Sequence, residues 1–249
     1  MQDKFWYREG WTLDMKNQSW TEDTENQAEF IVKALQLRGD ERILDLACGY
    51  GRHALALARR GFSVVGVDIT QELIDDANKN APPNAQFICA DIRDVQFEQE
   101  FDVVLNLADG AIGYLETDEE NLKIFDVIAK AMKPGGKHFM DVMRAEHAEA
   151  YFPKRWWEVG EKEIALAVFE WNPETRRSAF GGGGIRFGEI AQAPVPEIVP
   201  QDPVRLYSKE ELRDILQARG MEIVSAFSNY YGKPDTSKEL QLMVYSRKL

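Results

Sequence analysis

The sequence predicts an α/β fold: a doubly wound, mostly parallel, seven-stranded sheet, with an antiparallel, β-rich insertion over the active-site crevice. Three observations predict it. Short apolar runs alternate with helical periodicity between Glu41 and Val142, a glycine turn joins the first apolar run to a helix, and residues 145–204 change to a strand-like pattern. Alternating strands and helices form parallel sheets covered on both faces, which bind ligands beyond the carboxyl ends of the strands.

Each element follows from a local pattern. Apolar runs predict strands over residues 42–47, 63–68, 86–91, 101–107 and 137–143. Helical periodicity predicts helices over residues 52–60, from Thr70 to Pro82, and from Asp118 to the Pro134-Gly-Gly turn. A further helix begins at a capping box of Ser208 and Glu211, and strands are expected over residues 221–227 and 239–246.

Charge and composition argue against several classes of partner. The formal net charge is −12, whereas nucleic acids are bound largely by Lys and Arg that neutralise phosphates. No apolar run reaches the roughly 18 residues needed to cross a bilayer, and the N-terminus lacks a signal-peptide pattern. We therefore expect a cytoplasmic protein that binds neither nucleic acid nor membrane. Cys48 and Cys89 have no CxxC partner or nearby His, which predicts buried thiols and no metal site.

The strongest chemical signal is Asp45-Leu-Ala-Cys-Gly49-Tyr-Gly51-Arg-His. A strand ends, glycines let a ligand approach the backbone, and the N–H groups of a new helix point at that ligand. Asp68 ends the next strand, where a carboxylate can accept both hydroxyls of a ribose. The turn also fits the dinucleotide fingerprint, but Asp45 would lie badly beside a pyrophosphate and no Tyr-x-x-x-Lys pair is present. A nicotinamide-dependent oxidoreductase stays an alternative.

Several of these segments resemble one enzyme family. ILDLACGYGRHALALARRGFSVVGVD resembles the first two motifs of class I S-adenosylmethionine-dependent methyltransferases, and CADIRD, FDVVLNL and KPGG resemble later ones. The resemblance covers residues 30–142, with a weaker echo in RLYSKEELRDILQARGMEIV. It implies S-adenosylmethionine as the cofactor and says little about the acceptor. Ala47-Cys48 stands where many members have Gly-Cys or Gly-Ser, a departure that we expect to cost little.

The resemblance also implies roles for the matched residues at the first two strand ends. Asp45 and Gly49 would serve the methionine ammonium and carboxylate of the cofactor. Asp68 would hold the ribose, with Ile69 against the adenine.

At the next two strand ends, Asp91 would accept from the adenine amino group, Ile92 would offer its backbone N–H, and Asn106 would offer a backbone carbonyl near the methionine. The cofactor-binding residues implied in all are Asp45, Ala47, Gly49, Gly51, Arg52, Asp68, Ile69, Asp91, Ile92 and Asn106.

With this resemblance, the chain divides into three parts. Residues 1–29 form an N-terminal aromatic cap segment, residues 30–144 plus 205–249 the cofactor-binding α/β domain, and residues 145–204 a β-rich insertion or lid. In the insertion, Asn172 to Thr175 predicts a hairpin turn, Gly181 to Gly184 a flexible or tightly bent segment, and Ala193 to Pro203 an extended covering segment. We expect the cap and the lid to close the crevice from opposite sides.

Candidate proton acceptors follow the fourth and fifth strands. They are Asp109, Tyr114 and His147. His53 is interpreted as structural or on the cofactor side, and His138 as structural. Because methyl transfer from a sulfonium depends mainly on positioning and desolvation, we expect no single base whose loss abolishes turnover.

Aromatic residues are dense in both flanks of the predicted α/β domain. They either form the core of the added layers or line an apolar or cation-binding pocket. They are Phe5, Trp6, Tyr7, Trp11, Trp20, Trp156, Trp157, Trp171, Tyr230 and Tyr231.

The sequence thus predicts a methyltransferase that acts on a small-molecule acceptor at nitrogen or oxygen. A protein methyltransferase and a non-catalytic S-adenosylmethionine-binding protein are the alternatives. The loop after the fourth strand lacks the Asn/Asp-Pro-Pro-Tyr/Phe signature of enzymes that methylate planar nitrogens. The acceptor, the methylated atom and the oligomeric state are left undetermined.

Overall fold

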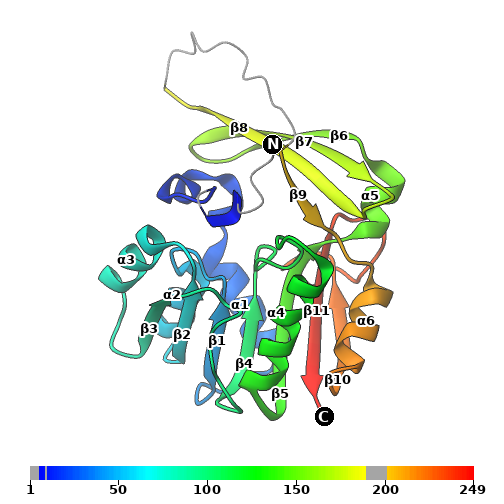
Figure 1. The fold of residues 1–249 in the computed structure, drawn as a ribbon. Coiled ribbons are helices and arrows are strands. Elements are labelled where there is room, and N and C mark those ends of the chain that lie inside the picture. The colour runs from blue at the N-terminus through cyan, green and yellow to red at the C-terminus, as the bar shows by residue number, and fades with distance from the viewer. Residues whose placement is uncertain (1–5, 9, 189–200) are drawn as a thin grey trace.

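The computed structural model describes residues 6–8, 10–188 and 201–249. Its centre is a seven-stranded sheet in the order β10-β11-β5-β4-β1-β2-β3 (Figure 1). The strands are β1 (Arg42–Leu46), β2 (Ser63–Asp68), β3 (Ala85–Cys89), β4 (Phe101–Asn106), β5 (Met132–Met143), β10 (Met221–Phe227) and β11 (Gln241–Lys248). β1 to β5 are parallel, and β11 runs antiparallel to both neighbours. The mostly parallel sheet predicted from the sequence is confirmed.

Helices cover both faces of this sheet. α1 (Thr24–Ala34), α2 (Arg52–Arg59) and α3 (Gln71–Lys79) pack on one face with Ile43, Val64 and Val103. α4 (Asp118–Ala131) and α6 (Lys209–Gln217) pack on the other with Leu44 and Val65. Successive strand residues therefore enter opposite cores, as expected of strands buried on both sides. The strand order reverses between β1 and β4, which is where doubly wound sheets bind ligands.

A second sheet is antiparallel and has the order β6-β7-β8-β9. Its strands are β6 (Lys154–Val159), β7 (Glu163–Asn172), β8 (Arg177–Arg186) and β9 (Gln201–Arg205), and α5 (Ala145–Tyr151) leads into it. Figure 1 shows it beyond the carboxyl ends of β1 and β4. Asn172 turns the β7–β8 hairpin, since its Oδ1 accepts from the main-chain N–H groups of Glu174 and Thr175 at 3.0 and 3.2 Å.

Three short 3-10 turns of the N-terminal segment, η1 (Trp6–Arg8), η2 (Leu13–Asn17) and η3 (Ser19–Thr21), precede α1. Figure 1 shows this blue segment between the second sheet and the helices over β1 to β3. α1 was not predicted, and it begins inside the part of the chain taken as a cap. Among the described residues, no helix is both long and apolar enough to cross a membrane.

Two element predictions were wrong. Gly181 to Gly184 is not a flexible bend but lies within β8, paired with Val168 to Ala165 of β7. A Cβ on Gly184 would lie 2.5 Å from Glu163 Oε2, so a larger residue there would displace the end of the Glu163 side chain.

The end of α4 was also misplaced. The helix ends at Ala131, and the Pro134-Gly-Gly turn lies within β5. The residue before a proline avoids helical backbone, which stops the helix ahead of Lys133. Cys89, expected to be buried, is exposed. Residues 193–200 of the predicted covering segment lie outside the described residues.

Candidate active site

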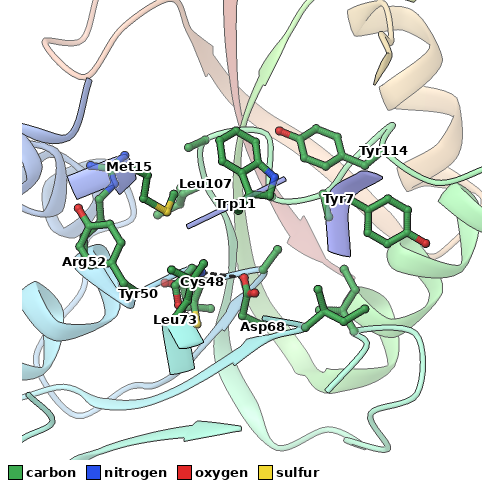
Figure 2. A pocket seen from close by; sticks show the side chains of 18 of the residues that line it. Tyr7, Trp11, Met15, Cys48, Tyr50, Arg52, Asp68, Leu73, Leu107 and Tyr114 are labelled. Atoms are coloured by element: carbon green, nitrogen blue, oxygen red, sulfur yellow. Dashed lines mark hydrogen bonds between the residues drawn. The ribbon is translucent and has the colours of Figure 1, made fainter. Parts of the chain in front are cut away.

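A pocket of about 930 Å³, its open mouth included, lies at the carboxyl ends of β1 to β4. Its walls come from the turn after β1, the ends of β2 and β3, the loop after β4, and the N-terminal segment. Figure 2 shows Trp11 above Asp68 and Cys48, with Tyr7 and Tyr114 beside it and Met15 across from them. Elements far apart in the sequence therefore close around one space.

The structure brings most of the predicted site residues to this pocket. The predicted residues that line it are Asp45, Ala47, Gly49, Arg52, Asp68, Ile69, Asp91, Ile92 and Tyr114. Gly51, Asn106, Asp109 and His147 are not among the lining residues. Gly51 has a packing role instead, because a Cβ there would lie 2.6 Å from the ring of Phe87.

The glycine turn is held open by Asp68. Asp68 Oδ2 accepts from the Gly49 N–H at 2.8 Å, and its Oδ1 accepts from the Thr70 N–H at 2.9 Å. Ala47, Gly49 and Gly51 all have positive φ, at 57°, 57° and 75°. This left-handed path leaves the first N–H groups of α2 without helical partners at the pocket, where they can bind a carboxylate.

Asp45 is a buried acid that forms no salt bridge with any residue the structure describes. It is 2% exposed and lines the pocket. Burial raises its pKa to about 7; Arg52 and the Ala54 N–H lower the pKa only in part, and Asp68 raises it further. Arg52 is directed elsewhere, since its Nη1 donates to Gln27 Oε1 at 2.6 Å and Thr24 Oγ1 at 2.9 Å. A positively charged ligand group would stabilise the ionised form of Asp45.

Asp91 is already bound by protein groups. Its Oδ1 accepts from the N–H and Nε of Arg93 at 3.0 and 2.9 Å, and Arg93 Nη2 lies 2.5 Å from Oδ2. Arg8 Nη2 adds a contact at 3.9 Å. Burial raises the pKa of Asp91, but Arg93 more than offsets it, and the net pKa lies below its usual range. The carboxylate is fixed in its charged form at the pocket wall.

The loop after β4 has an unusual backbone. Four consecutive residues, Ala108 to Ala111, have φ between 50° and 68°, a left-handed turn that costs roughly 1–2 kcal/mol for each residue other than glycine. The side chain of Asn106 supports the turn by donating to the Gly110 carbonyl at 3.1 Å. Three residues of this turn, Ala108, Gly110 and Ala111, line the pocket.

The three candidate proton acceptors have different surroundings. Tyr114 lines the pocket, and its hydroxyl lies 3.4 Å from Asp109 Oδ2, while Asp109 Oδ1 accepts from the Met143 N–H at 3.1 Å. Burial, and then the charge of Asp141, raise the pKa of Asp109 to about 7. His147 lies in α5, where its Nδ1 donates to the Lys238 carbonyl at 2.9 Å. Asp109 and Tyr114 are thus one unit near the pocket, and His147 is apart from it.

Comparison with known proteins agrees with this geometry. Residues 43–136 match the model of a family described as a methyltransferase domain. This segment runs from β1 through β5 and includes the glycine turn, Asp68 and Asp91. The segment is therefore similar to methyltransferase domains, and solved structures of methyltransferases, one of them titled as S-adenosylmethionine-dependent, share the fold.

Individual relatives match over different lengths. YqeM of Bacillus subtilis (strain 168), which bears a methyltransferase name, is 32% identical over 115 residues, 45% of this chain and 46% of that protein. The cypemycin N-terminal methyltransferase of a Streptomyces species is 25% identical over 203 residues, 81% of each chain. The solved structure of the CcbJ methyltransferase from Streptomyces caelestis has a TM-score of 0.73 at 17% identity, covering 91% of this chain and 95% of that one.

Around the methyltransferase domain, the N-terminal segment supplies pocket residues that were not assigned to the site from the sequence. Tyr7, Trp11 and Trp20 were among the flanking aromatic residues expected either to form core or to line a pocket, and they line this pocket; Met15 was not noted at all. Aromatic density was the available signal for the first three. Phe5 lies outside the described residues, and Trp156 and Trp157 are exposed on β6.

Proposed function

We propose that this protein transfers a methyl group from S-adenosylmethionine to a small-molecule acceptor. The observation that carries the proposal is Asp45, a buried carboxylate in the pocket wall beside a glycine turn and a helix N-terminus. A carboxylate next to free N–H groups suits the ammonium and carboxylate of an amino acid, and suits a pyrophosphate badly. This argues against the nicotinamide alternative.

The described residues fit the cofactor from one end to the other. Asp45 and the Gly49 turn would hold the methionine ammonium and carboxylate, and a Cβ on Gly49 would meet only Met15, at 3.7 Å. Asp68 would take the ribose, with Ile69 and Ile92 against the adenine. Each oxygen of Asp68 now accepts one main-chain hydrogen bond, and a carboxylate has about four acceptor sites, so it keeps room for two hydroxyls.

Asp91 is proposed for the adenine amino group on the same reasoning, although Arg93 occupies one side of its carboxylate. Arg93 fixes the charge and the direction of Asp91, so here the arginine acts as a positioning residue. Asn106 would act through the left-handed turn that it supports, and Gly51 through its packing on Phe87.

When bound, S-adenosylmethionine supplies a methyl carbon that an acceptor lone pair attacks as the carbon–sulfur bond breaks and its electron pair stays on sulfur. The protein positions the two reactants and excludes water from them. Trp11, Tyr7 and Trp20 cover the polar strand ends and remove water from them. Asp109, with a pKa near 7, is placed to receive a proton through Tyr114 or solvent.

A small acceptor is favoured by the enclosing wall. Tyr7 and Tyr114 are 6% and 7% exposed, and both line the pocket, one from the N-terminal segment and the other from the loop after β4. Two similar solved structures bear titles naming them a sugar N-methyltransferase and a 1,6-didemethyltoxoflavin-N1-methyltransferase. The cypemycin enzyme name, however, indicates a peptide terminus, so a peptide is the second acceptor to test. A cytoplasmic location and the absence of a nucleic-acid partner remain predictions from the sequence.

The test is incubation of the protein with methyl-labelled S-adenosylmethionine and a cell extract separated into metabolites, peptides, proteins and nucleic acids. We expect label in a metabolite, and none with Asp45→Ala. Asp75→Ala, an exposed acid on α3, is the control and should label as the unmodified protein does. Label confined to protein or nucleic acid, or no label in any fraction, would contradict the proposal.

A further inference from the structure

We infer that the acceptor is an amine, which the pocket binds as an ammonium ion with aromatic rings and buried carboxylates, and which passes one proton to Asp109 or solvent before its nitrogen lone pair attacks the methyl carbon. This inference rests on the proposed function and names its substrate class. Three features carry it: ring faces at the pocket wall, an excess of buried acid, and the lack of a cation that could receive an anionic acceptor.

The ring faces come from the N-terminal segment and the loop after β4. Trp11 and Tyr114 both line the pocket, with ring centroids 6.4 Å apart and planes inclined by 13°. Trp6 fixes Tyr114 from behind, with centroids 4.9 Å apart. Trp and Tyr faces carry negative charge density and attract cations within about 6 Å of the centroid. Figure 2 shows Trp11 and Tyr114 together over the strand ends.

The pocket already shows this kind of contact on its wall. The Arg52 guanidinium lies 5.2 Å from the centroid of the Trp20 ring, and Lys16 Nζ lies 5.0 Å from that of Tyr50. The rings of Trp20 and Tyr50 thus carry protein cations, whereas no cation of the described part of the chain stacks on Trp11. Trp11 contacts the rings of Trp6 and Tyr114 and no described cation, so a ligand cation can take that role.

Two buried carboxylates lie behind the Tyr114 side of the pocket. Behind Tyr114, its hydroxyl contacts Asp109, and the Asp109 N–H donates to the Asp141 carbonyl at 2.8 Å. Asp141 Oδ2 accepts from the Tyr230 hydroxyl at 2.7 Å, and within the described ranges neither acid has a salt-bridge partner. Burial, and then the charge of Asp141, raise the pKa of Asp109, and Arg52 offsets the effect of burial on the pKa of Asp141 only in part. An ammonium in the pocket would add a second positive charge near these acids.

Positive groups are scarce in the same wall. Of the described lining residues, Arg52 is the one permanent cation, and Thr24, Gln27 and Trp20 already engage it. His53 is held neutral, because burial and Arg52 keep its pKa well below the usual value. An acceptor with a carboxylate or phosphate beside its nucleophile would be buried against acids without a counter-charge, which is strongly unfavourable. The ammonium of the cofactor would compensate the charge of Asp45 but not that of the other acids.

The experiment compares three probes of one shape and three charges. Choline is the cation, 3,3-dimethylbutan-1-ol the neutral isostere and 3,3-dimethylbutanoate the anion. Each is titrated by calorimetry into the protein, both free and saturated with S-adenosylhomocysteine. We expect choline to bind at least about tenfold more tightly than the alcohol, and the anion not to bind. Equal affinities for choline and the alcohol, or tighter binding of the anion, would overturn the inference.

Variants then locate the site. Trp11→Leu should weaken choline binding about tenfold and leave the alcohol unchanged, while Trp11→Phe should keep most of the preference. Trp157→Leu, at an exposed ring of β6, is the matched control and should change nothing. Charge preference unchanged in Trp11→Leu would place the cation elsewhere and contradict the inference.

The two proposals fail separately. If S-adenosylhomocysteine does not bind, the proposed function falls, and the titrations of the free protein still decide whether the pocket prefers the cation. If it binds and choline is not preferred, the methyltransferase proposal stands and the amine inference falls.

Discussion

Asp45 links the charge of the pocket to pH. An ammonium can bind only its ionised form, and its pKa is about 7 in the free protein, raised by burial. Binding lowers that pKa, so affinity for S-adenosylhomocysteine should be full above pH 7 and fall as the pH drops. The ionised fraction of an acid of pKa 7 falls roughly 50-fold between pH 7 and pH 5. Calorimetry at pH 7, 6 and 5 measures the loss.

Asp45→Asn provides the comparison for this prediction. It should bind weakly at every pH and lose the slope, whereas Asp75→Asn should keep both the affinity and the slope of the unmodified protein. A slope that survives in Asp45→Asn would assign the titration to another group.

Ala47 has a strained backbone, and comparison with the resembled family indicates the position. It stands where many members of the resembled family have glycine, and its φ is 57°. Since a left-handed alanine costs roughly 1 kcal/mol, Ala47→Gly should raise the free energy of unfolding by about 0.5–1 kcal/mol. The departure was expected to cost little, and this measures how little.

Ala54→Gly is the control for that prediction, because Ala54 lies inside α2 and glycine there should lower stability by about 1 kcal/mol. Urea unfolding curves measure both changes. If the two variants shift the midpoint in the same direction, the strain at Ala47 is absent.

At the residue scale, the site could be predicted where a strand ends. Asp45, Asp68 and Asp91 follow apolar runs, and parallel strands bring their carboxyl ends to one edge. The state of each acid could not be predicted, because it depends on distant neighbours: Arg93 turns toward Asp91, while Arg52 turns away from Asp45 toward Gln27. His147 follows the fifth strand, yet α5 carries it away from the pocket.

Among the elements, the loop after β4 is tied to the second sheet at Gly113. Its carbonyl accepts from the Arg205 N–H of β9 at 2.8 Å, and its φ is 89°. A Cβ there would lie 2.0 Å from the Arg205 carbonyl oxygen. Gly113→Ala should therefore cost about 2–4 kcal/mol, combining left-handed strain with a clash against main chain.

Gly61→Ala separates the two causes. Gly61 also has a positive φ, of 98°, but a Cβ would meet nothing within 4 Å, so only the strain of about 1 kcal/mol applies. Thermal or urea unfolding measures both variants. Equal losses of unfolding free energy in the two variants would show that β9 causes no steric clash at Gly113.

Element types were predictable where one period dominates, as in α2 and β4. The predictions were wrong where they relied on the composition of a short segment. Four glycines suggest a bend, yet β8 uses them as a strand because Glu163 fills the space beside Gly184. The KPGG segment suggests a helix end, yet Met132 already pairs with Phe101 in the sheet. In both cases, contacts with residues far away in the sequence determined the secondary structure.

Across the whole molecule, the N-terminal segment lines the pocket and contacts the second sheet, and we predict that the two together cover the crevice. Tyr7 donates to Glu116 at 2.7 Å, ahead of α4, and Ser19 donates to Glu158 of β6 at 3.1 Å. Amide exchange should therefore slow in residues 6–20 and 108–115 when S-adenosylhomocysteine binds, whereas Gly181 to Gly184 should be protected even without it, since β7 pairs with them. Exchange in residues 6–20 that ignores the ligand would contradict a covering role.

The most direct test of the central claim is calorimetric titration of S-adenosylhomocysteine into the protein and its Asp68→Ala and Asp75→Ala variants. We predict one site per chain, unaffected by Asp75→Ala. In Asp68→Ala, the loss of two hydrogen bonds to a charged group should weaken binding roughly 30- to 1,000-fold, with folding checked by circular dichroism. An unmodified protein that does not bind the ligand, or a folded Asp68→Ala variant that binds it unchanged, would contradict the assignment of this crevice to S-adenosylmethionine.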